Sequence, residues 1–187
     1  MKKKLVVIGY GGMGGWHTRA AEKSDVVTLG GIYDIKEERR KAAEDAGIFS
    51  YDSFEAVLAD PTVDLVTIAV PNDEHERLTV AALEAGKNVI NEKPVTLTSQ
   101  SLKRMIDASE RAGKLLTVHQ NRRWDVDYLA MQKIVDSGEI GEILNVESRV
   151  QGSRGIPSDW RGEKKYGGGM LYDWGIHLLD QVLLLFG

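Results

Sequence analysis

The stretch Leu5-Val6-Val7-Ile8-Gly9-Tyr10-Gly11-Gly12-Met13-Gly14 decides the fold of this chain. Its four leading apolar residues predict a buried strand, and the G-x-G-x-x-G pattern predicts a tight turn into a helix. Gly9 permits the turn, Gly11 lets the backbone approach a pyrophosphate, and Gly14 lets the helix pack against the sheet. A helix N-terminus presents free N–H groups to phosphate, so the sequence predicts a dinucleotide site.

Asp34 lies twenty residues beyond the last of these glycines, directly after a predicted strand at residues 26–33. A carboxylate in this place can accept both ribose hydroxyls of an adenosine, and it repels a 2′-phosphate. NAD is therefore the expected cofactor. NADP is the alternative, because Lys36, Arg39 and Arg40 would offset the repulsion. An ordinary aspartate that caps a helix beginning near Lys36 would explain the same residue.

The composition excludes several classes of protein. The chain has 187 residues, enough for one domain and part of another, and the 42% that are apolar suffice for a buried core. The net charge is −4, and no basic stripe suggests a nucleic-acid partner. The absence of cysteine excludes disulfides and thiolate catalysis. No apolar run is long enough for export or for a membrane span, so a cytoplasmic location is expected.

Strands and helices alternate through the first two-thirds of the chain, which predicts a doubly wound parallel α/β sheet of the Rossmann type. The expected strands are residues 4–8, 26–33, 64–70, 88–91 and 115–119. The expected helices are residues 16–23, 36–46, 53–59, 74–85 and 99–112. Later elements are a helix at 125–137, an alternating strand at 142–151, a glycine-rich loop at 152–169 and a helix at 171–186. The sequence thus predicts a Rossmann domain over residues 1–121 and a second domain from residue 122.

Three polar loops follow predicted strands at one edge of the sheet, where ligands bind in open α/β folds. They begin with Pro71-Asn72-Asp73-Glu74-His75, Glu92-Lys93-Pro94 and His119-Gln120-Asn121-Arg122-Arg123. In the last helix, Asp173 and His177 are four residues apart, a spacing that puts them on one face and suits proton transfer. An ordinary surface pair explains the same spacing. No third ligand with metal-site spacing accompanies them, so no metal is expected.

Taken in order, these motifs resemble those of the Gfo/Idh/MocA oxidoreductases, a family that includes inositol dehydrogenases and glucose–fructose oxidoreductases. The matching elements are Gly9-x-Gly11-x-x-Gly14, Asp34, Pro71-Asn72-x-x-His75, Glu92-Lys93-Pro94, Trp160-Arg161 and Gly168-Gly169-x-x-x-Asp173-x-Gly175-x-His177-x-x-Asp180. The resemblance implies an NAD(P)-dependent dehydrogenase that transfers a hydride between a nicotinamide and a secondary alcohol of a polyol, sugar or sugar derivative. A non-catalytic regulator that senses dinucleotides on the same fold is the alternative.

The resemblance also implies a role for each motif residue. His177 would be the general base, Lys93 would hydrogen-bond the reacting hydroxyl, and Asp173 would contact the substrate or orient the catalytic group. A solvated surface lysine is the alternative for Lys93. The implied cofactor-binding residues are Gly9, Gly11, Gly12, Met13, Gly14, Asp34, Pro71, Asn72, His75, Glu92, Lys93, Pro94, Asn121, Trp160 and Arg161.

Members of this family are usually much longer, so the chain resembles a truncated member. Residues 122–187 would then be the N-terminal part of an incomplete α+β substrate and oligomerisation domain, whose large sheet is mostly missing. The strand at 142–151 would lack most of its neighbours, and the apolar run Val182–Phe186 would be exposed. Such a fragment would bind the cofactor without full activity. The expected partners are a small polyol or sugar and either a second copy or another chain that covers the apolar surface.

Overall fold

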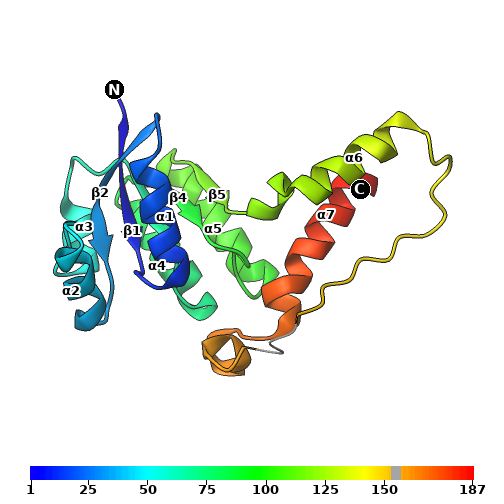
Figure 1. The fold of residues 1–187 in the computed structure, drawn as a ribbon. Coiled ribbons are helices and arrows are strands. Elements are labelled where there is room, and N and C mark those ends of the chain that lie inside the picture. Colours follow the sequence, from blue (N-terminus) through cyan, green and yellow to red (C-terminus); the bar gives the residue numbers. More distant parts are fainter. Residues whose placement is uncertain (153–156) are drawn as a thin grey trace. The chain divides into compact units, whose positions relative to one another are not determined.

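A parallel sheet of five strands forms the centre of the first part of the chain (Figure 1). Its members are β1 (Lys3–Ile8), β2 (Val27–Tyr33), β3 (Leu65–Ile68), β4 (Asn88–Asn91) and β5 (Leu116–Val118). The computed structural model describes residues 1–152 and 157–187, which form two compact units, Met1–Val118 and His119–Gly187. The five strands lie where the sequence predicts them, and the predicted doubly wound architecture of the first unit is confirmed.

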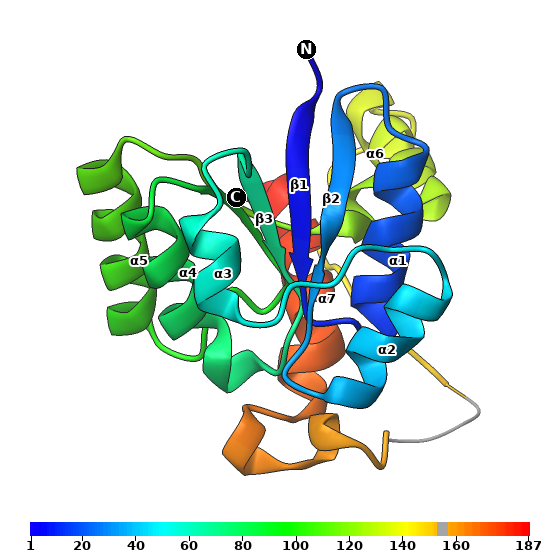
Figure 2. The same ribbon diagram turned by 90° about the vertical axis from the view of Figure 1, so that its left-hand side faces the viewer.

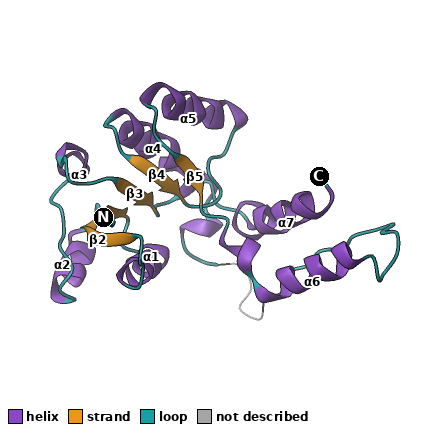
Figure 3. Cartoon of the chain, turned by 90° about the horizontal axis from the view of Figure 1, so that it is seen from above, coloured by secondary structure: helices purple, strands orange, loops and turns teal. Residues whose placement is uncertain are grey.

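Helices alternate with the strands and cover both faces of this sheet. α1 (Gly12–Glu22) and α2 (Glu37–Asp45) lie on one face, and α4 (His75–Glu84) and α5 (Ser99–Ala112) lie on the other (Figures 2 and 3). The short helix α3 (Phe54–Ala59) precedes β3 and begins where predicted, because the Ser53 hydroxyl accepts a hydrogen bond from the Ala56 N–H at 3.0 Å.

The strand order is β2-β1-β3-β4-β5, and a single parallel bridge between Ile32 and Ser50 adds a rudimentary neighbour beside β2. With that bridge counted as the third strand in chain order, the arrangement is the one typical of dinucleotide-binding sheets. The order reverses between β1 and β3. Dinucleotides bind at such a reversal, outside the carboxyl ends of the strands, so the topology places the expected site beside Gly9.

The last residues of β1, β3 and β4 are paired with one another, so the loops that follow these strands begin side by side at the same edge of the sheet. Ile8 of β1 pairs with Ile68 of β3, and Ile68 pairs with Asn91 of β4. The side chains of Val6, Val7 and Ile8 are almost fully buried, as expected for a strand covered on both faces. A rigid apolar core therefore supports the loops that carry the candidate site.

A polar node lies where the chain approaches β3. The Asp60 carboxylate accepts hydrogen bonds from the Tyr51 hydroxyl at 2.7 Å, from the Lys4 ammonium at 3.1 Å and from the Thr62 hydroxyl at 2.6 Å. The hydrogen bonds from Thr62 and then Tyr51 hold the pKa of Asp60 below its ordinary value. Burial, with the neighbouring Asp60, raises the pKa of Tyr51. The node ties β1 to the residues that precede β3.

The second unit contains α6 (Val126–Ser137) and a π-helical turn, Leu171–Gly175, that continues into α7 (Ile176–Phe186). The predicted strand at 142–151 is wrong, because residues 143–152 form neither helix nor strand. A strand is held by hydrogen bonds to a neighbour, and alternation alone supplies none. Residues 153–156 of the predicted glycine-rich loop lie outside the described residues, and the rest of it includes short 3-10 turns at Trp160–Gly162 and Lys164–Tyr166. Among the described residues, no helix has the length and apolar content that a bilayer span requires.

Candidate functional site

The glycine turn after β1 leaves no room for side chains at two of its positions. Gly9 has a φ of 92°, and a Cβ added there would lie 2.4 Å from the Ala69 carbonyl oxygen. A Cβ on Gly14 would lie 1.8 Å from the Gly9 carbonyl oxygen, whereas one on Gly12 would meet nothing within 4 Å. Gly9 and Gly14 are therefore fixed by close packing of β1, β3 and α1, as the motif predicts.

The N-terminus of α1, where the phosphate site is expected, has no side-chain cap. Gly11 occupies the N-cap position, no side chain caps the helix, and its first turn, which includes Met13, contains no acidic residue. Helices commonly satisfy these terminal N–H groups with a Ser, Thr, Asp or Asn side chain. An uncapped terminus that follows a tight glycine turn fits a pyrophosphate, whose oxygens can accept from the N–H groups.

Asp34 directly follows β2 and is 3% exposed. Its carboxylate accepts from the Tyr10 N–H at 2.7 Å and the Lys36 N–H at 2.9 Å, and the Arg39 guanidinium lies 3.2 Å away. Lys36, rather than Asp34, is the N-cap of α2, so the helix-cap alternative is wrong. A carboxylate can accept about four hydrogen bonds, which leaves Asp34 capacity for a ribose hydroxyl.

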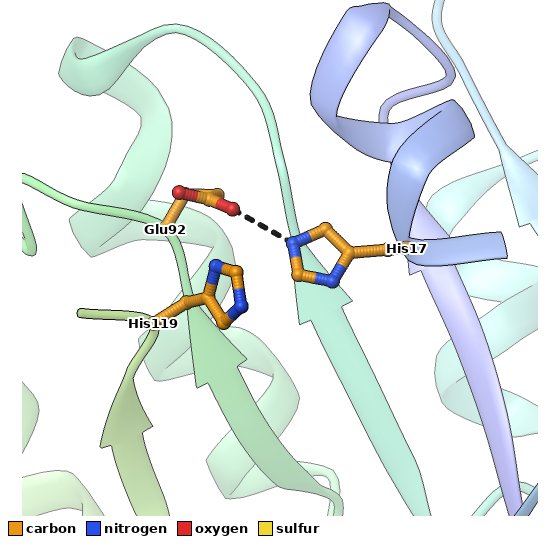
Figure 4. A group of neighbouring side chains, drawn as sticks. All are labelled: His17, Glu92 and His119. Atoms are coloured by element: carbon orange, nitrogen blue, oxygen red, sulfur yellow. Dashed lines mark hydrogen bonds and ion pairs between the residues drawn. The ribbon is translucent and has the colours of Figure 1, made fainter. Parts of the chain in front are cut away.

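Lys93 lies in the loop after β4, between the buried residues Glu92 and Pro94. The Glu92 carboxylate is 2.7 Å from Nε2 of His17 on α1 (Figure 4) and also accepts from the Lys93 N–H at 3.2 Å. Figure 4 draws His119 as well, the residue that directly follows β5 and begins the second unit. The Lys93–Pro94 peptide bond is cis.

His75 begins α4 and is fully buried beside the same loop. Its Nδ1 lies 2.8 Å from the Pro94 carbonyl oxygen, and its Nε2 lies 3.0 Å from the Val70 carbonyl oxygen. Burial lowers the pKa of His75, although the two carbonyl groups and the charge of Glu92 act in the opposite direction. The ring thus joins the end of β3 to the Lys93–Pro94 segment.

The remaining residues of the loop after β3 lie in a 3-10 turn, Asn72–Glu74, for which Pro71 is the N-cap. Asn72 is 5% exposed, so this part of the predicted cofactor groove is packed rather than solvated. The first unit therefore gathers the predicted residues of the glycine turn and of the loops after β2, β3 and β4 at the carboxyl ends of its strands.

The second unit contains the other predicted residues. Asn121 begins a 3-10 turn, and the Arg161 guanidinium stacks on the Trp160 ring with 4.6 Å to its centroid. Asp173, in the π-helical turn, has its carboxylate 3.7 Å from Nε of Arg161. His177, in the first turn of α7, is 4% exposed. A solvated surface pair is therefore the wrong description of this histidine.

The role of one buried residue of the first unit, His17, was not predicted from the sequence. His17 lies three residues beyond Gly14 and is 7% exposed, and its partner Glu92 is 75 residues away in the chain. A histidine at the start of a predicted helix carries no local sign of such a partner. The sequence offered one indication. His17 lies close to the glycine motif, and it is the only titratable side chain between Tyr10 and Arg19.

Comparison with known proteins agrees with this geometry. A family model described as "Oxidoreductase family, NAD-binding Rossmann fold" matches residues 3–120, and the model of the "GFO/IDH/MocA C-terminal domain" matches residues 128–187. The chain belongs to the Gfo/Idh/MocA oxidoreductase family. Its first unit is accordingly an NAD-binding Rossmann domain, and the resemblance seen in the motifs is confirmed.

Three relatives illustrate the likeness. An NAD-binding protein of Listeria innocua has a crystal structure that aligns with a TM-score of 0.96 and 51% identity, over 99% of this chain and 55% of that one. The scyllo-inositol 2-dehydrogenase (NADP(+)) of Bacillus subtilis is 32% identical over 98% of this chain and 52% of its own length. GenD2 from gentamicin A biosynthesis, solved in complex with NAD, aligns with a TM-score of 0.87 and 26% identity, over 100% and 54% respectively. The chain thus spans about half the length of these relatives.

Proposed function

We propose that this Gfo/Idh/MocA protein is an NAD(P)-dependent dehydrogenase that acts on a secondary alcohol of a polyol or sugar derivative. The observation that carries the proposal is the placement of Lys93. It follows β4, which lies two positions from β1 in the sheet, at the carboxyl ends of the strands near the topological switch point, and both of its neighbours in the chain are buried. Ligands bind at this edge of an open α/β sheet, so the Lys93 ammonium is placed to hydrogen-bond the hydroxyl of a substrate.

The cofactor would be held by groups that the first unit already presents. The N–H groups at the start of α1 would bind the pyrophosphate, and Asp34 would accept from the adenosine ribose. Bound NAD(P) would supply the hydride acceptor. The loops of Asn72, His75 and Glu92 would form the groove, and we assign Asn121, Trp160 and Arg161 of the second unit to the nicotinamide end on the basis of the family motif.

The protein would supply the proton chemistry. Lys93, as a cation, would hydrogen-bond the substrate oxygen and stabilise negative charge as it develops there. His177 in its neutral form would take the hydroxyl proton. Asp173 would contact the substrate or orient that histidine. The relative named scyllo-inositol 2-dehydrogenase supports a cyclic polyol as the substrate class. A small polyol and a second copy of the chain remain the proposed partners.

The test is a binding assay followed by a turnover assay on the protein and on Lys93→Met. Thermal shift and tryptophan fluorescence would measure NAD and NADP binding, and reduced-nicotinamide absorbance would follow a panel of inositols and other polyols. In a protein of the relatives' full length, Lys93→Met should keep cofactor affinity and lose at least about 100-fold in kcat, the range expected when an electrostatic donor is removed. Cofactor binding without turnover of any polyol, in a protein of the relatives' full length, would overturn the dehydrogenase and support the dinucleotide-sensing alternative.

A further inference from the structure

A buried pair crosses the sheet edge between the phosphate-binding helix and the Lys93 loop. His17 lies on α1, which follows β1, and Glu92 follows β4, with β3 between those two strands. The side chains of His17 and Glu92 are 8% and 7% exposed, and Nε2 lies 2.7 Å from Oε1. A carboxylate oxygen only accepts, so the histidine donates from Nε2.

The same carboxylate reaches the backbone of Lys93. Oε2 of Glu92 accepts from the Lys93 N–H at 3.2 Å, while Oε1 is the oxygen that meets His17. The orientation of the Glu92 side chain is thus fixed from one side by α1, and it fixes the Lys93 backbone from the other. Charge-assisted hydrogen bonds in buried surroundings hold their geometry more firmly than neutral bonds at the surface.

We propose that His17 is a positioning residue for Lys93, acting through Glu92 and coupling the helix that binds the cofactor phosphates to the residue that meets the reacting hydroxyl. The proposal rests on the function proposed above for Lys93. Because α1 carries both the phosphate-binding terminus and His17, any ligand that orders this helix also orders the Lys93 segment. Misplacement of a catalytic group by about 1 Å can cost about 100-fold in rate, so such a link has a functional use.

The first test uses the cofactor-free protein. Hydrogen–deuterium exchange of the peptide that covers residues 92–97 would be compared between the wild-type protein, His17→Leu and His17→Gln. Loss of the donor should raise exchange of this segment at least about tenfold, while peptides that cover β1 and β3 stay protected. His17→Gln retains an N–H donor and should restore much of the protection. It also serves as the milder variant should His17→Leu fold poorly.

A matched control lies at the next position on the same helix. Thr18 is 1% exposed and donates its hydroxyl to the Gly15 carbonyl oxygen at 2.9 Å, so Thr18→Val disturbs α1 without removing the donor to Glu92. It should leave exchange of residues 92–97 unchanged. Equal loosening in Thr18→Val and His17→Leu, or no change in either, would overturn the proposal.

The second test separates binding from catalysis. His17→Leu should lower kcat at least about tenfold while the dissociation constant of NAD changes less than about threefold, because the phosphate-binding N–H groups are untouched. A kcat equal to that of the wild-type protein would also overturn the positioning role. If a protein of the relatives' full length turns over no polyol, the proposed function fails, but the exchange comparison still decides whether His17 fixes the Lys93 segment.

Discussion

The imidazole of His75 lies 2.8 Å through Nδ1 from the carbonyl oxygen of Pro94, and the opposite nitrogen faces a second carbonyl oxygen, that of Val70. A neutral ring has one N–H and can donate to only one of the two carbonyls, whereas a protonated ring can donate to both. Burial nevertheless holds the pKa of His75 below its ordinary value of 6.5. The surroundings of His75 thus have opposite effects on its pKa: burial lowers it, and the two carbonyl groups raise it.

The lowered pKa predicts acid destabilisation. Below about pH 6.5 the unfolded chain binds a proton at His75 that the folded protein does not bind, so the free energy of unfolding falls as the pH falls. For one proton the slope is at most about 1.4 kcal/mol per pH unit, and it ends at the folded pKa. Chemical denaturation between about pH 7 and pH 5 should show a smaller slope in His75→Gln. A wild-type slope equal to that of the variant would show that the two carbonyl groups offset the burial.

The glycine turn predicts a sharp contrast between two alanine substitutions. Gly14→Ala places a Cβ 1.8 Å from a backbone oxygen and should cost at least about 1–3 kcal/mol of unfolding free energy or prevent folding. Gly12→Ala, which meets nothing within 4 Å, should change that free energy by less than about 0.5 kcal/mol. Urea denaturation of the two variants measures the difference. Equal losses would remove close packing as the reason for Gly14.

Cofactor preference should depend on the contact between Asp34 and Arg39. Asp34→Ser removes the ribose acceptor and should weaken NAD more than NADP, shifting the ratio of their dissociation constants about tenfold. Arg39→Ala should shift the ratio toward NAD, because it removes the cation that offsets the carboxylate. The Arg40 guanidinium donates to the carbonyl oxygens of Asp34 and Ile35 rather than to the Asp34 carboxylate, so Arg40→Ala is the control. Losses that are the same for both dinucleotides would take Asp34 away from the ribose.

The polar node at Asp60 predicts a second pH effect, at lower pH. Its pKa is lowered in the folded protein, so its stabilisation is present above about pH 4 and is lost as the pH falls toward the folded pKa. Asp60→Asn should lose about 1–3 kcal/mol at neutral pH, because the Tyr51, Thr62 and Lys4 donors lose a charged acceptor. Asp107→Asn, at the surface, should change little. Thermal unfolding of both variants would contradict the role of the node if the two losses were equal.

Local signals in the sequence predicted most of the first unit. The bounds of β4 and α5 agree with the prediction. The end of α5 was predictable because Gly113, with a φ of 60°, occupies the position that requires a left-handed conformation. The glycine turn and Asp34 were identified because their spacing follows from the geometry of one βα unit. Interactions between distant segments were not accessible in this way. The contact of His17 with Glu92 and the Asp60 node join residues that no periodicity relates.

In the second unit, local patterns in the sequence predicted less of the structure. Residues 142–151 alternate as a strand should, yet alternation reports only which side chains face a core and not whether a neighbouring strand exists. The helix at its end was predicted correctly in extent, but not in its internal geometry. Apolar spacing does not reveal that residues 171–175 form a wider turn than the α-helix that follows.

That wider turn has a consequence for the direction of Asp173. A π-helical turn contains one more residue than the α-helical turn it replaces, and one residue corresponds to a rotation of about 100° about a helix axis. Deletion of Trp174, which lies between Asp173 and α7, would restore a continuous α-helix and turn Asp173 away from its present side while α7 stayed in place. The direction of this carboxylate therefore depends on the number of residues in the turn, which substitutions leave unchanged.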